Sequence, residues 1–170
     1  MDIYVIVLRI VHIFAGVFWV GAAWMIAGFL NPTAKQTGPA GQPFMQKLFQ
    51  GRLSMVISAA AGLNVLAGAL LYWKDSAGFR LVWIGTPVGI GFTAGAVVGL
   101  IAFGIGTGVT GPAARKLAAL GMTIQTGGKP PTAEQGVALQ KLQQKLSVTA
   151  QWTAVLVALA LFFMATARYY

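Results

Sequence analysis

Residues 3–30 read IYVIVLRIVHIFAGVFWVGAAWMIAGFL and decide the fold class of this 170-residue chain. A helix needs roughly 20 apolar residues to cross the hydrocarbon core of a bilayer. This run is longer than that and holds one basic residue, Arg9, and one histidine, His12. Three further apolar runs of sufficient length lie at residues 53–73, 82–110 and 147–167. The sequence therefore predicts an all-α, polytopic membrane protein, a four-transmembrane-helix bundle that forms a single integral membrane domain over residues 1–170.

Composition supports this class and excludes others. The chain is 57% hydrophobic and 9% charged, with 12 Lys and Arg against 3 Asp and Glu. The cations stand in short connectors and form no basic patch interleaved with aromatic residues, so we expect a lipid bilayer and no nucleic acid as the partner. Cysteine is absent, which excludes disulfides, thiolate metal sites and c-type haem attachment.

The distribution of cations predicts the orientation. Eight of the twelve Lys and Arg lie in the connectors after the first and third apolar runs. By the positive-inside rule, these long connectors are cytoplasmic and both termini lie outside, as in a multi-pass protein of the bacterial-type inner membrane. Asn31-Pro32 is predicted to end the first helix. The second long connector is predicted to be a helical hairpin, broken by residues 127–131, whose second helix begins with a capping box at Thr132 to Gln135.

Small residues predict how the helices pack, because close backbone contact stabilises helix pairs in lipid. The third run carries two glycine stripes on roughly opposite helical faces, namely Gly91, Gly95 and Gly99, and Gly104, Gly108 and Gly111. Two such faces imply two close neighbours. One neighbour could be a second copy in a homodimer, a subunit of a larger membrane complex or a flat cofactor. Alternatively, both could be ordinary helix contacts inside one bundle.

His12, the only histidine, is the candidate functional residue, because a polar ionisable group inside an apolar span is costly unless it has a partner. No apolar run has Asp, Glu or Lys in its middle, which disfavours proton-coupled transport. Scattered Met residues and a single His disfavour copper. Asn64 is the other polar side chain within a span, and we expect it to form an interhelical hydrogen bond.

Arg9 and His12 are three residues apart and share a helix face. A neutral imidazole is a metal ligand, so His12 could ligate the iron of a b-type haem whose propionates pair with Arg9. Gly16, one turn deeper, would leave room for a flat macrocycle. The alternative is structural: His12 donates to a carbonyl of a neighbouring helix, and Arg9 extends towards the membrane surface.

One resemblance bears on this choice. The pattern His12-x-x-x-Gly16-x-x-Trp19-x-Gly21 resembles the opening signature of a group of bacterial membrane proteins. The group comprises copper-resistance D-like domains, the membrane part of cytochrome-linked urate oxidases and four-helix protoporphyrinogen oxidases. Residues 63–73 resemble their second span. In the porphyrin-oxidising members the first-span histidine is implicated in haem binding, and the resemblance implies this role for His12.

The chain departs from those members because residues 82–110 lack the lysine that they use. The enzymatic role is therefore not carried over, and we assign no catalytic residues. With one histidine per chain, a second axial ligand would come from a symmetric dimer or from Met164. Two hypotheses follow. One is a small haem-binding membrane protein with an electron-transfer or haem-handling role, with His12, Arg9, Gly16 and Met164 at the site. The other is a non-enzymatic structural or accessory subunit.

Overall fold

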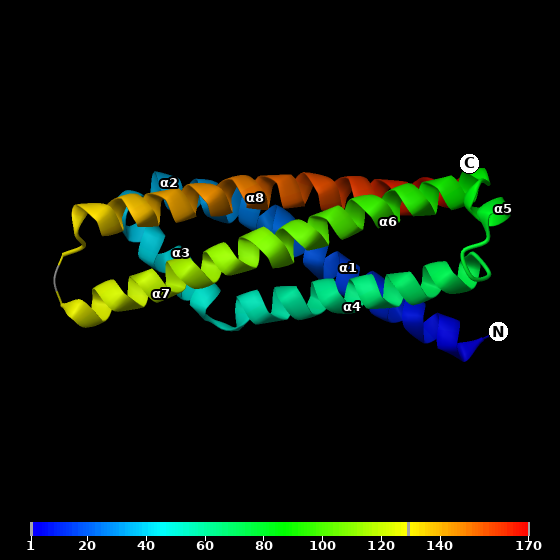
Figure 1. Cartoon of the computed structure of the whole chain (residues 1–170), viewed down its shortest axis with the longest axis horizontal. Coiled ribbons are helices and arrows are strands. Elements are labelled where there is room, and N and C mark those ends of the chain that lie inside the picture. The colour runs from blue at the N-terminus through cyan, green and yellow to red at the C-terminus, as the bar shows by residue number, and fades with distance from the viewer. Residues whose placement is uncertain (1, 129, 170) are drawn as a thin grey trace.

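The computed structural model describes residues 2–128 and 130–169, which form a long bundle of helices (Figure 1). In chain order the elements are α1 (Ile3–Met25), the π-helical turn η1 (Ile26–Leu30), α2 (Asn31–Gln36), the 3-10 turn η2 (Gly38–Ala40), α3 (Gly41–Gln50), α4 (Arg52–Asp75), α5 (Leu81–Ile84), α6 (Pro87–Ile105), the π-helical turn η3 (Gly106–Thr110), α7 (Gly111–Gly127), α8 (Ala133–Thr166) and the 3-10 turn η4 (Ala167–Tyr169). No strand is present in these two ranges. The predicted all-α fold is confirmed.

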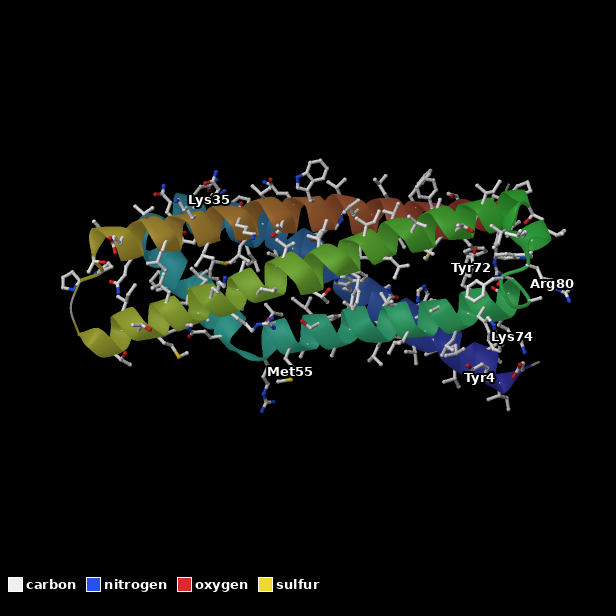
Figure 2. All side chains as sticks on the ribbon, in the orientation of Figure 1. Tyr4, Lys35, Met55, Tyr72, Lys74 and Arg80 are labelled. Atoms are coloured by element: carbon white, nitrogen blue, oxygen red, sulfur yellow. The ribbon has the colours of Figure 1, made fainter. Side chains whose placement is uncertain are left out.

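Four stretches are long and apolar enough to cross a membrane, namely Ile3–Gln36, Arg52–Asp75, Pro87–Gly127 and Ala133–Tyr169. They form two main pairs: α1 packs along α4, and α6 and α7 pack along α8. Both chain ends and α5 lie at one end of the bundle, here named the terminal end, and the α7–α8 connection lies at the other, the connector end (Figure 1). Figure 2 shows Tyr4, Tyr72, Lys74 and Arg80 towards the terminal end and Lys35 towards the connector end.

The first helix does not end at Pro32, so that prediction is wrong. In η1 the backbone hydrogen bond reaches back five residues, from Asn31 N–H to the carbonyl of Ile26. The wide π turn accommodates the proline ring in the next turn, and the helix continues through α2. η3 repeats the pattern before Pro112 of α7. Because proline has no amide hydrogen, one carbonyl near each π turn loses its helical donor.

The third long helix begins later than the predicted range 82–110. Leu81–Ile84 form the separate short helix α5, and the chain turns before α6. Thr86 caps α6, since its Oγ1 accepts the amide hydrogen of Gly89 at 3.0 Å. Pro87 follows at the first helical position, where its missing amide hydrogen costs nothing. The cap and the proline together fix this start.

α7 and α8 are separated by a break in the helix, and α8 begins with the predicted capping box. α7 ends at Gly127, and Gly128 adopts a left-handed conformation with φ +60°, which glycine tolerates without strain. Thr132 N–H donates to Gln135 Oε1 at 2.9 Å, and Gln135 N–H donates to Thr132 Oγ1 at 3.2 Å. These two bonds satisfy amide groups at the start of α8 that have no helical partner. The capping-box prediction is confirmed.

Small residues let the four long helices approach one another. Trp19 of α1, Ala61 of α4, Ala102 of α6 and Val157 of α8 form the buried core. On α6, a Cβ added at Gly95 would lie 2.8 Å from Met164 Cγ and 3.2 Å from the Ala160 carbonyl oxygen, both on α8. The stripe of Gly91, Gly95 and Gly99 therefore serves contact within the chain at Gly95. At Gly104 and Gly108 an added Cβ meets nothing within 4 Å.

Candidate functional site at the α1–α4 interface

His12 lies between α1 and α4, where it forms a hydrogen bond that determines its tautomer. Its Nδ1 lies 2.8 Å from the main-chain carbonyl oxygen of Asn64. A carbonyl oxygen can only accept, so Nδ1 carries the proton and donates. In a neutral ring, Nε2 then holds the lone pair. The ring is thus fixed in position by one nitrogen and keeps the other for a ligand.

Two glycines make room for this contact by a reciprocal arrangement. The imidazole of His12 lies over Gly68 of α4, where an added Cβ would be 2.8 Å from Cε1 and 3.0 Å from Nδ1. The side chain of Asn64 lies against Gly16 of α1, where an added Cβ would be 2.8 Å from Oδ1. Each helix therefore presents a polar residue and, four residues later, a glycine. Residues at this spacing share a helix face, so each polar side chain fills the space that the partner's glycine leaves.

The polar atoms of this contact are not all satisfied within the described residues. Asn64 Oδ1 is buried there without a hydrogen-bond partner, although a polar side chain in an apolar span normally has one. Asn64 thus joins the helices through its main-chain carbonyl, and the predicted side-chain bond is not found for Oδ1. His12 is half-buried, and its Nε2 has no hydrogen-bond partner in the described part of the chain, yet is not sealed inside the bundle.

The other predicted site residues are dispersed around this contact. Arg9 lies one turn from His12 and is exposed. Gly16 faces Asn64, so the space expected for a macrocycle at that position is filled. Met164 packs against Gly95 of α6, whereas α1 diverges from α8 towards its N-terminus (Figure 1). The structure therefore places Met164 and His12 in separate helix contacts.

Two features of the site were not predicted from the sequence, namely the Asn64 carbonyl as the partner of His12 and the place of the His12 ring over Gly68. A main-chain acceptor leaves no signal, since every residue of α4 carries a carbonyl group. Gly68 could have been found, because the His-x-x-x-Gly spacing of α1 recurs as Asn-x-x-x-Gly in α4. In the described ranges, no three His, Cys, Asp or Glu residues gather into a group that could hold a metal ion. Any metal at His12 would thus need ligands from a cofactor or another molecule.

Comparison of the chain with protein-family models, with characterised protein sequences and with solved structures gives no match.

Proposed function

We propose that this chain is an integral membrane protein that binds a b-type haem through Nε2 of His12, in an electron-transfer or haem-handling role. The observation that carries the proposal is the 2.8 Å hydrogen bond from Nδ1 to the Asn64 carbonyl. Histidines that ligate metals almost always donate their other ring N–H in this way, because the bond fixes the tautomer and the ring orientation. The same bond would also suit a purely structural histidine, so the distinguishing feature is Nε2, which has no hydrogen-bond partner in the described part of the chain.

The residues present fit a haem with one protein ligand from each chain. Asn64 and His12 already fill the spaces at Gly16 and Gly68, so the macrocycle would contact the outer surface of the α1–α4 pair. Arg9, exposed on the next turn towards the terminal end, would pair with the propionates. A second axial ligand would come from His12 of another copy, since Met164 contacts α6. Haem, when bound, supplies a one-electron iron couple.

In this proposal the terminal end faces outwards and the connector end faces the cytoplasm of a bacterial-type cell. The basis is the eight Lys and Arg of the long connectors against four elsewhere in the chain. His12 then lies in the outer half of the membrane, and Arg9 lies nearer the outer lipid headgroups. Single cysteines placed at each end of this cysteine-free chain would test the orientation by labelling intact cells with an impermeant maleimide.

The test of haem binding is the absorption spectrum of protein purified in a neutral detergent from cells supplied with δ-aminolaevulinate. We expect a Soret band and a stoichiometric pyridine haemochrome, both lost in His12→Ala. Gly68→Ala should lower the haem content, since its methyl group displaces the imidazole without removing the ligand. Gly62→Ala is the matched control on α4, because an added Cβ there meets nothing within 4 Å. A colourless protein that binds no added haemin, or a His12→Ala variant that stays coloured, would refute the proposal.

A second candidate, a structural or accessory subunit, is favoured by one observation. Gly104 and Gly108 are exposed and have open space around them, and open small-residue faces are typical contact sites between membrane helices. Gly104→Cys should then form disulfide-linked dimers or cross-links to a neighbouring subunit in native membranes. Leu161→Cys, at an exposed site on α8, serves as the control. Equal cross-linking from both positions would indicate random collision and exclude this face.

A further inference from the structure

The connector half of the bundle contains a cleft of about 1070 Å³ that no sequence motif indicated. Ligand sites of small molecules typically occupy some 300–1,000 Å³, so the cleft is large enough for a sizeable ligand. Its walls come from all four long helices and from α3. It is distinct from the α1–α4 contact, since His12 and Gly68 do not line it.

The end of the cleft beside the buried core is apolar. Trp19, Ala61 and Phe103 line it there, and Trp19 and Ala61 belong to the buried core. The rings of Trp19 and Phe103 meet edge to face, with centroids 6.4 Å apart. This end of the cleft is formed by residues of α1, α4 and α6. It would therefore accept a hydrocarbon group and exclude a strongly hydrated one.

The part of the cleft nearer the connector end is polar but carries little charge. Glutamines from three helices line it, among them Gln46 of α3, Gln125 of α7 and Gln143 of α8. The ionisable residue of the described lining is Lys35, and no Asp or Glu accompanies it there. Lys35 Nζ donates to Ser147 Oγ at 3.1 Å, and Figure 2 shows this lysine beside α8. An ammonium group has three hydrogens, so two remain for an anion.

Thr110, the last residue of η3, also belongs to the lining of the cleft. Its Oγ1 is buried, with less than 1 Å² of accessible surface, so this oxygen is not presented to a ligand in the cleft. The cleft thus offers an apolar end and a single cation.

We propose that this cleft binds a single-chain anionic amphiphile, with its hydrocarbon chain towards Trp19 and Phe103 and its head group at Lys35. Along an α-helix, the sixteen residues from Trp19 to Lys35 span about 24 Å at 1.5 Å per residue, which suits a long alkyl chain. An anionic head is favoured because Lys35 lacks a carboxylate partner in the described lining. The head-group chemistry is shared by fatty acids and by alkyl phosphates. The proposal is independent of haem binding.

The test is equilibrium binding of radiolabelled palmitate to the full chain in dodecyl maltoside. Unlabelled palmitate and hexadecyl phosphate should compete, the stronger competitor identifying carboxylate or phosphate as the preferred head group. Methyl palmitate and hexadecyltrimethylammonium should not compete. Non-saturable binding, or competition by the methyl ester equal to that by palmitate, would overturn the proposal.

Matched variants test the assigned residues. Lys35→Gln should weaken binding about ten- to a hundredfold, the range that a hydrogen bond to a charged group supplies. Lys116 of α7 is an exposed cation, as Lys35 is, but lies outside the cleft, so Lys116→Gln should bind like the wild type. Thr110→Val should also bind like the wild type, because Thr110 Oγ1 is not accessible from the cleft. Equal affinities of the Lys35 and Lys116 variants would contradict the assignment.

Discussion

Gly68→Ala is the most direct test of the α1–α4 contact, because it adds one methyl group beneath the His12 ring. The added Cβ would lie 2.8 Å from Cε1 and 3.0 Å from Nδ1, closer than van der Waals contact allows. The imidazole must therefore move, which strains its 2.8 Å hydrogen bond to the Asn64 carbonyl. Gly62→Ala places the same methyl group on the same helix in open space.

The two substitutions should change the free energy of unfolding differently. Overpacking of this kind costs about 1–3 kcal/mol, and the strained interhelical bond adds less than about 1 kcal/mol. Gly62→Ala should be neutral or stabilise the fold by up to about 1 kcal/mol, because alanine restricts the unfolded backbone more than glycine does. The difference between two chemically identical changes would thus be about 1–5 kcal/mol, the sum of these ranges.

A double-mutant cycle with His12→Ala assigns this difference to the ring. Without the imidazole, the methyl group of Gly68→Ala has space, so its cost should fall to nearly zero and the coupling free energy should be about 1–3 kcal/mol. The assay is reversible unfolding in mixed micelles of dodecyl maltoside and sodium dodecyl sulfate, followed by far-ultraviolet circular dichroism. If Gly68→Ala costs the same with and without His12, within about 0.5 kcal/mol, the proposed packing of the ring is refuted.

Three further predictions concern other contacts. Gly16→Ala brings a Cβ to 2.8 Å from Oδ1 of Asn64 and should lower the unfolding free energy by about 1–3 kcal/mol. Gly21→Ala, in open space on the same helix, should not lower it, and equal losses would argue against this contact. Thr132→Ala removes the capping box and should cost about 0.5–2 kcal/mol, with faster amide exchange confined to the first turn of α8; unchanged exchange there would contradict the cap. Lys74→Met breaks the exposed 3.1 Å ion pair with Asp2 and should change stability by less than about 1 kcal/mol, an effect that vanishes in high salt; a larger, salt-independent loss would contradict this assignment.

The sequence predicted the fold class and the four long helices, because apolar runs of membrane length have few alternative structures. Its errors were at helix ends. Pro32 signals a helix stop in most contexts, but a π turn before it lets the helix continue, and no local residue pattern specifies that turn. The start at Pro87 was missed because the apolar residues of α5 join the run to its start at Val82.

The candidate site was predictable only in part. His12 stands out in the sequence because a polar group in an apolar run is costly, whereas its partner is a main-chain carbonyl 52 residues away. The cleft was not predictable, because its lining draws single residues from many separate elements. Lys35 and Thr110 each resemble ordinary connector or helix-end residues, and only the tertiary structure shows that they line one space.

The paired π turns have a consequence for the readiness of the cleft. A helix that widens only transiently can return to regular α geometry, but Pro32 and Pro112 have no amide hydrogen with which to complete the tighter ladder. The missing hydrogens are permanent features of the covalent chain, so neither helix can form a complete α-helical ladder at these positions. The walls beside them are preorganised, so an occupant would enter without first remodelling the backbone.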